Sequence, residues 1–138
     1  MKIDRLSEAR GIQRGEQALA ALRPHFRPEV VDLIVTKTIP AGQRQQILQA
    51  LSRYQRDSQE MSCRVRLSVL KLSQGNTEEL RNQIDIATQD VRDVLMPAEN
   101  PTLHEMGVVA WSRLDDDEKD RISNNDVESY LNWINNPG

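Results

Sequence analysis

The residues of this chain that could carry nucleophilic or metal chemistry are few and stand far apart. Cys63 is the single cysteine, and His25 and His104 are the only histidines among the 138 residues. A cysteine nucleophile needs a nearby base to form its thiolate, and a zinc site needs several histidine or cysteine ligands. No histidine lies near Cys63 in sequence, so we expect a semi-buried structural thiol, with no bound metal or other cofactor.

Two short motifs resemble metal sites, and each lacks ligands that such a site needs. His104 and the glutamate after it begin like the His-Glu-x-x-His motif of zinc proteases, but position 108 is valine. The segment Asp115–Asp126 is similar to an EF-hand calcium loop at Asp115, Asp117, Ile122 and Ser123. Lys119 stands where that family has a ligand, and Asp120 stands where it has glycine. We therefore interpret this run as the acidic start of a capped helix.

Other classes of enzyme site find little support in the sequence. The chain contains no phosphate-binding glycine loop, no dinucleotide fingerprint and no Gly-x-Ser-x-Gly element. Carboxylates are plentiful, but general acid–base catalysis needs a carboxyl group held in an apolar pocket. We predict that the protein is not an enzyme, and a carboxylate site stays as a third hypothesis.

Charge is divided unevenly along the chain, although the formal net charge is only −3. Residues 1–73 hold 13 Lys and Arg against 7 Asp and Glu, whereas residues 74–138 hold 5 against 14. Such halves either neutralise each other within one fold or present two unlike surfaces to partners. The single cysteine and the absence of a visible signal peptide or long apolar run predict a cytoplasmic protein with no membrane partner.

A stripe of basic residues makes nucleic acid the alternative partner. Arg53, Arg56, Arg64 and Lys71 fall on one side of a predicted helix. In an antiparallel hairpin, acids of the next helix are expected opposite Lys71, Arg64 and Arg56, namely Glu79, Asp85 and Asp93. We expect these acids to neutralise the stripe, which favours a protein as the partner.

The elements that would position these residues are predicted to be helices. Residues 7–23 and 28–38 carry apolar side chains at helical spacing, and Pro28 suits the first position of the second helix. Gly11 and Gly15 lie on one side of the first helix, from which we expect a close crossing with another helix. The second segment is apolar on most sides, so we expect it to be central and buried, with a strand as the alternative.

The strongest pattern is a heptad repeat between residues 43 and 74. Apolar and small side chains recur at Ile47, Leu51, Tyr54, Ser58, Met61, Val65, Ser68 and Leu72. No proline or glycine interrupts the repeat, which predicts one helix of about 45 Å. The alternative is a break near Ser58 followed by a strand over residues 63–69. The spacing resumes after Gly75, and the short connection predicts an antiparallel hairpin over residues 43–96.

The C-terminal residues 100–138 are expected to form a separate acidic part, after a linker at residues 97–101. Asn100 can cap a helix, and Ser112 begins a capping-box pattern ahead of the acidic run. Ser123 is expected to open the last helix.

Together these patterns predict an all-α fold, a bundle of five to seven helices built on the hairpin. Residues 1–96 form the expected helical domain, and residues 100–138 form a small acidic subdomain packed on it. We predict a non-catalytic module for protein–protein interaction (an adaptor, a chaperone-like protein or an inhibitor). The alternative is a nucleic-acid-associated regulator that uses the arginine-rich N-terminal half. The expected partner surface joins an aromatic anchor to a charged rim, at Trp111, Asp115, Asp116, Asp117, Asp120 and Trp133.

Overall fold

The computed structural model describes residues 5–55 and 58–138, and these residues form helices and no strand. The all-α prediction is therefore confirmed. The α-helices are α1 (Arg5–Leu22), α2 (Pro28–Thr38), α3 (Arg44–Ser52), α4 (Gln59–Ser73), α5 (Thr77–Gln89), α6 (Arg92–Glu99), α7 (Pro101–Met106), α8 (Val108–Ser112) and α9 (Asp116–Asn135). Two short 3₁₀ helices, Arg23–His25 and Ala41–Gln43, precede α2 and α3.

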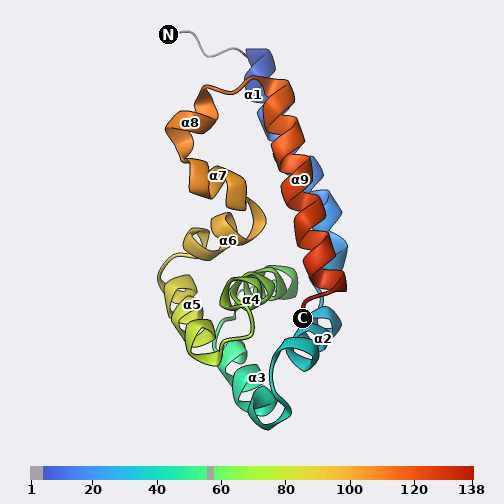
Figure 1. Ribbon diagram of the computed structural model, residues 1–138, viewed down its shortest axis with the longest axis vertical. Helices are drawn as coiled ribbons and strands as arrows, with labels where there is room; N and C mark the ends of the chain where they lie inside the picture. The colour runs from blue at the N-terminus through green and yellow to red at the C-terminus, as the bar shows by residue number, and fades with distance from the viewer. Residues whose placement is uncertain (1–4, 56–57) are drawn as a thin grey trace.

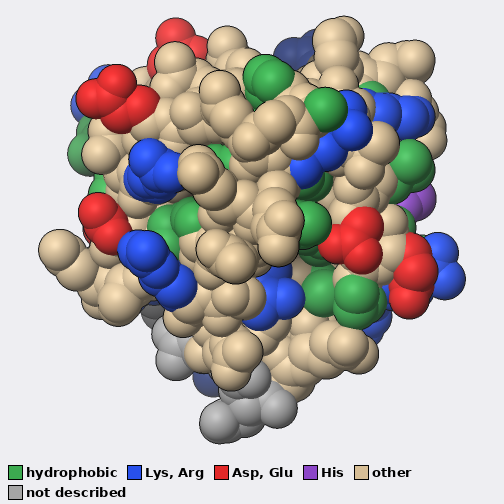
Figure 2. All heavy atoms as spheres, turned by 90° about the horizontal axis from the view of Figure 1, so that it is seen from below, with side chains coloured by type: hydrophobic (Ala, Val, Ile, Leu, Met, Phe, Trp, Pro, Cys, Tyr) green, Lys and Arg blue, Asp and Glu red, His purple; other side chains and the backbone are tan. Residues whose placement is uncertain are grey.

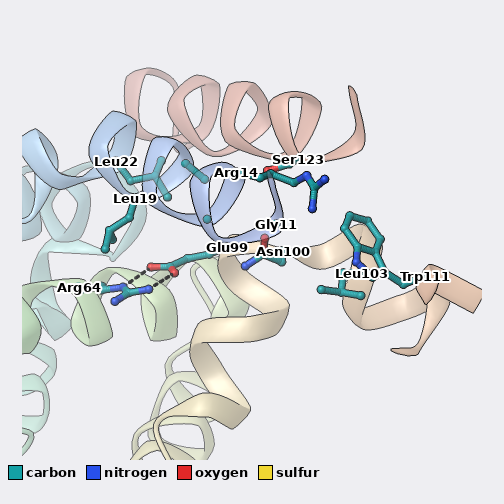
Figure 3. A pocket seen from close by; sticks show the side chains of 12 residues that line it. Gly11, Arg14, Leu19, Leu22, Arg64, Glu99, Asn100, Leu103, Trp111 and Ser123 are labelled. Carbon is teal, nitrogen blue, oxygen red and sulfur yellow. Dashed lines mark hydrogen bonds and ion pairs between the residues drawn. The ribbon is translucent and has the colours of Figure 1, made fainter. Parts of the chain in front are cut away.

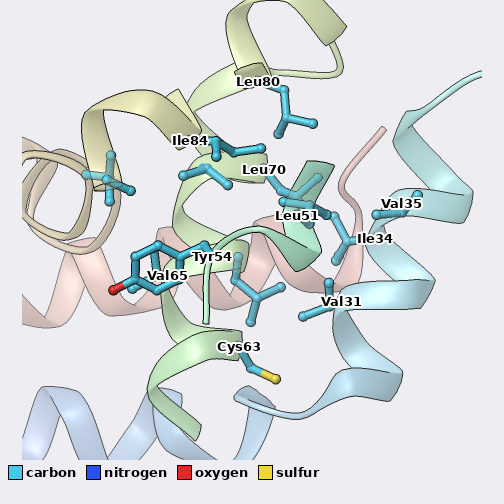
Figure 4. Close-up of a cluster of buried hydrophobic side chains, with 14 of the residues drawn as sticks. Val31, Ile34, Val35, Leu51, Tyr54, Cys63, Val65, Leu70, Leu80 and Ile84 are labelled. Carbon is cyan, nitrogen blue, oxygen red and sulfur yellow. The ribbon is translucent and has the colours of Figure 1, made fainter. Parts of the chain in front are cut away.

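Helix α4 lies at the centre of the fold. Side chains on most of its circumference are buried, including Cys63, Val65 and Leu67. Figure 4 shows side chains of this helix meeting those of α2, α3 and α5 in one apolar cluster. The sequence predicted the central position for residues 28–38. That prediction was wrong, because α2 buries one face and leaves Leu33 on the other exposed.

The continuous helix expected over residues 43–73 is divided in two. Helix α3 ends at Ser52, and α4 begins at Gln59. The Ser58 hydroxyl accepts a hydrogen bond from the Met61 amide at 3.0 Å and so caps α4. The break falls where the alternative interpretation put it, but a helix follows it instead of a strand.

A side chain of α4 stabilises the end of α3. Arg66 donates from Nε to the carbonyl of Leu51 at 3.1 Å and from Nη2 to the carbonyl of Tyr54 at 2.9 Å. Carbonyls at the end of a helix have no partner within the helix, so the guanidinium supplies donors that further helical turns would otherwise provide. The Tyr54 side chain is buried, which explains why the apolar spacing continues beyond the end of the helix.

The antiparallel hairpin is confined to α4 and α5. Gln74 and Gly75 end α4 with positive φ angles of 51° and 81°, and the Asn76 side chain caps α5. A Cβ atom on Gly75 would lie 3.0 Å from the carbonyl oxygen of Thr38. Glycine is therefore required here by both backbone conformation and space.

The linker expected at residues 97–101 is helical. Helix α6 continues through Pro97 to Glu99, and α7 starts at Pro101. As a result α6, α7 and α8 follow one another up one side of the molecule (Figure 1).

The first and last helices lie side by side along the opposite side of the molecule (Figure 1). Helix α9 runs unbroken through Ser123, so the helix start predicted at that residue was wrong. The carboxylate of Asp115 caps α9 by accepting a hydrogen bond from the Glu118 amide at 2.8 Å. The capping box predicted at Ser112 is therefore displaced by three residues, although the acidic run is a capped helix start as expected.

Candidate functional site

A pocket of about 410 Å³ lies between α1 and the helices that follow α5. Figure 3 shows residues of α1 on one wall, with residues of α6, α7 and α8 facing them. Apolar, glycine and polar residues share the lining: Gly11, Arg14, Gly15, Ala18, Leu19, Leu22, Arg64, Glu99, Asn100, Leu103, Trp111 and Ser123. Ligand pockets typically measure about 300–1,000 Å³ and combine apolar walls with a few polar groups. We take this pocket as the candidate functional site.

The glycines of α1 open space for the pocket. A Cβ atom on Gly15 would meet no atom within 4 Å, and one on Gly11 would meet only the Arg14 side chain at 3.6 Å. The close helix crossing that the sequence predicted at these glycines is therefore wrong. The sequence correctly placed both residues on one side of the helix, and that side faces the pocket.

An ion pair closes one end of the pocket. Arg64 donates from Nε and Nη2 to the two carboxylate oxygens of Glu99, at 2.8 and 2.6 Å. Glu99 is only 6 % exposed, and bidentate pairs of this kind are among the stronger hydrogen-bonded contacts. The hydrogen bonds to Glu99 raise the pKa of the Arg64 guanidinium. The sequence predicted Asp85 opposite Arg64, but the end of α6 supplies the partner instead.

The acidic residues predicted for a partner surface make ion pairs or hydrogen bonds with other residues of the same chain. They occupy the start of α9: Asp115, Asp116, Asp117 and Asp120. Arg10 binds Asp117 and Asp120, each at 2.6 Å, and Arg14 binds Asp120 at 2.6 Å and Asp116 at 3.3 Å. No basic run stands near these acids in sequence, and the two arginines that pair with them lie 102 to 110 residues away along the chain. That these acids contact a partner stays a prediction.

Arg14 joins this ion-pair group to the pocket. Its Nε and Nη2 atoms are bound by Asp120 and Asp116, which leaves Nη1 without a hydrogen-bond partner in the described part of the chain. This Nη1 atom lies beside Gly11, and both residues line the pocket. The Arg14 side chain is 11 % exposed. Arg14 therefore offers the pocket a hydrogen-bond donor while its charge is already neutralised.

Ser123 offers the pocket a hydroxyl. Most hydroxyls inside these helices donate to a carbonyl one turn earlier, as Ser68 does to Arg64 at 3.0 Å and Ser73 to Leu70 at 2.9 Å. Ser123 is 8 % exposed, and its hydroxyl has no such partner among residues 5–55 and 58–138.

Asn100 offers an amide. The sequence predicted that this side chain caps α7, but it makes no capping hydrogen bond. Asp126 of α9 performs that role, because its carboxylate accepts from the amide of Thr102 at 3.2 Å and from its hydroxyl at 2.7 Å. The Asn100 side chain remains beside the pocket with no partner in the described residues.

The two tryptophans occupy different environments. Trp111 of α8 lines the pocket, opposite α1 (Figure 3). Trp133 packs edge-on against Tyr130, with ring centroids 5.7 Å apart. The pocket therefore contains one of the six residues that the sequence proposed for partner binding. Leu103 and Glu99 were missed, since no local pattern marks them.

A smaller hollow of about 220 Å³ adjoins the pocket, since both are lined by Leu19 and Arg64. It reaches Arg23, whose guanidinium pairs with Glu60 at 2.8 Å. Gly11 and Arg23 are twelve residues apart, which corresponds to about 18 Å along a helix. We call these two neighbouring hollows, which share Leu19 and Arg64 in their linings, the groove of α1.

The basic stripe predicted for nucleic acid is not assembled as expected. Arg53 lies at the end of α3, Arg56 lies outside the described residues, and Arg64 is bound by Glu99. Lys71 is over the ring of Tyr130, 5.7 Å from its centroid, and burial lowers the pKa of its amine. On the face shown in Figure 2, basic and acidic side chains are interspersed and neither forms a continuous patch.

Among residues 5–55 and 58–138, no group of three or more His, Cys, Asp or Glu is arranged to hold a metal ion. Within the same residues, no helix has the length and apolar character needed to cross a membrane. Comparison with known proteins gives no match, either to a protein-family model, to a curated protein or to a solved structure.

Proposed function

We propose that the protein is a non-catalytic helical module that binds a segment of a partner protein in the groove of α1. The observation that carries the proposal is the pocket of about 410 Å³ beside Gly11 and Gly15. Three polar side chains at this pocket have hydrogen-bonding capacity left over within the described chain: Arg14, Asn100 and Ser123. Hydrogen-bonding groups beside apolar walls are typical of binding sites.

The charges at the groove favour this proposal over nucleic-acid binding. Affinity for nucleic acid depends on basic groups that can neutralise phosphates. The described arginines at the groove are already bound to carboxylates of the same chain, as Arg14, Arg23 and Arg64 illustrate. We also propose a cytoplasmic location, for which the support is the single cysteine: a protein with no cysteine pair suits a reducing compartment.

Site-specific photo-crosslinking in cells tests the proposal. The crosslinking residue p-benzoylphenylalanine replaces Ile12, which follows Gly11 on α1 and is 60 % exposed. The matched control replaces Leu33, which is 48 % exposed on α2. We expect a defined protein adduct at Ile12 and none at Leu33, with the linked peptide identified by mass spectrometry.

A pocket-blocking variant makes the test specific. Gly15→Leu places a side chain into open space at the pocket, and Gly42→Leu does so at a site where a Cβ atom also meets nothing within 4 Å. The Ile12 adduct should disappear in Gly15→Leu and persist in Gly42→Leu. An adduct that persists in both variants, or one that contains nucleic acid, would contradict the proposal.

A further inference from the structure

We propose that the pocket takes an uncharged, apolar stretch of the partner's polypeptide and holds it by a backbone carbonyl. This inference rests on the proposed function and adds the chemistry of the bound segment.

The charges at the pocket exclude a charged occupant. Three charged side chains line it, and each is paired within the chain: Arg64 with Glu99, and Arg14 with acids of α9. A carboxylate entering the pocket would have to compete with Glu99 for Arg64, and an ammonium would have to compete with Arg64 for Glu99. A charge that found no counter-ion there would be partly desolvated without compensation. The pocket is therefore complementary to a neutral group.

The remaining hydrogen-bonding groups suit a peptide carbonyl. Arg14 Nη1 can only donate, and the amide of Asn100 and the hydroxyl of Ser123 can donate as well. All three side chains are among those that line the pocket. A backbone carbonyl accepts one or two such hydrogen bonds and carries no charge, so it can use the hydrogen-bonding capacity that these three side chains leave free within the described chain.

The shape of the walls suits an apolar side chain next to that carbonyl. Leu103 and Trp111 form one wall of the pocket. The opposite wall is the stretch of α1 around Gly11 and Gly15, two residues from which no side chain projects. A backbone can approach glycine more closely than any other residue. One apolar side chain would thus lie against Leu103 and Trp111 while its own backbone lies against α1.

Three small probes that differ in charge test the inference: N-acetyl-leucinamide, N-acetyl-leucine and leucinamide. At pH 6 the first is neutral, the second is an anion and the third is a cation. Each is titrated into ¹⁵N-labelled protein, with the indole N–H signal of Trp111 as the reporter and that of Trp133 as the internal control. We expect the neutral probe to shift the Trp111 signal alone, and the charged probes to bind at least about tenfold more weakly.

A serine pair on α9 tests the hydrogen-bonding step. Ser123→Ala removes the hydroxyl at the pocket, whereas Ser129→Ala removes an exposed hydroxyl on the same helix. We expect several-fold weaker binding of N-acetyl-leucinamide by the first variant and unchanged binding by the second. The inference is overturned if a charged probe binds as tightly as the neutral one, if Trp111 does not respond, or if the two variants bind alike. Crosslinking at Ile12 is independent of these probes, so failure here leaves the proposed function to its own test.

Discussion

At the scale of single residues, three of the residues that line the pocket add little to the stability of the fold. Gly15 lies inside a helix, where glycine is about 1 kcal/mol less favourable than alanine, and no neighbour requires its small size. Ser123 is 8 % exposed and its hydroxyl makes no hydrogen bond within the described residues, and Asn100 occupies a capping position without capping. Residues that break local rules without a structural gain are typical of functional sites.

Replacing Ser123 by alanine should therefore not destabilise the protein. Alanine is the better helix former, and the hydroxyl that is removed makes no hydrogen bond within the described chain. We expect the free energy of unfolding in urea to rise by about 0.5 kcal/mol. A decrease of more than about 1 kcal/mol would mean that the hydroxyl has a structural role.

Two glycine-to-alanine variants should change stability in opposite directions. Gly15→Ala should raise the free energy of unfolding by about 1 kcal/mol, because the new Cβ atom meets open space in a helix. Gly75→Ala should lower it by about 1–3 kcal/mol, since φ is +81° and the new atom would lie 3.0 Å from the Thr38 carbonyl. Urea unfolding of both variants measures the two changes. Equal effects in the two variants would contradict this account.

At the scale of elements, the sequence predicted a helix well where residues next to that helix in the chain determine its ends. The segments predicted at 7–23 and 28–38 correspond to α1 and α2, because prolines follow the one and begin the other. The end of α3 could not be predicted in the same way. Arg66, a residue of another helix, binds the carbonyl of Leu51 in its last turn and the carbonyl of Tyr54 just after it, and a heptad pattern contains no information about such a contact.

Arg66→Ala should thus destabilise the junction between α3 and α4. The carbonyls of Leu51 and Tyr54 would each lose a charged donor, for which we expect a cost of about 2–3 kcal/mol in urea unfolding. Arg66→Lys should not restore stability, because an ammonium cannot reproduce the planar fork that binds two carbonyls. Arg81→Ala, at an exposed arginine of α5, is the control and should change stability by less than about 0.5 kcal/mol. Similar losses in Arg66→Ala and Arg81→Ala would contradict the role of Arg66.

At the scale of the whole molecule, the unequal charges of the two halves meet inside one fold. The sequence predicted neutralisation between neighbouring helices, but the ion pairs join α1 to α9 and α4 to the end of α6. The pocket lies between these two groups of ion pairs, with walls from residues as distant as Gly11 and Trp111. A single sequence indicates which residues share a helix face, but not which faces meet, so the pocket could not be predicted from it.

The ion pairs between α1 and α9 should make the thermal stability of the protein depend on pH in the acidic range. Hydrogen bonds from Arg10, the larger contribution, and from Arg14 hold the pKa of Asp120 below its ordinary value of 3.8. A carboxyl whose pKa is lower in the folded state stabilises the fold above its unfolded pKa, and this contribution is lost as the pH falls through the folded pKa. Asp120→Asn should therefore lower the thermal midpoint by a constant amount between about pH 5 and 7, and this difference should shrink below about pH 4. Glu128→Gln, at an exposed residue of the same helix, is the control and should follow the wild type at every pH. If the difference between Asp120→Asn and the wild type were the same at pH 3 as at pH 7, the ionised carboxylate would not be what joins the first helix to the last.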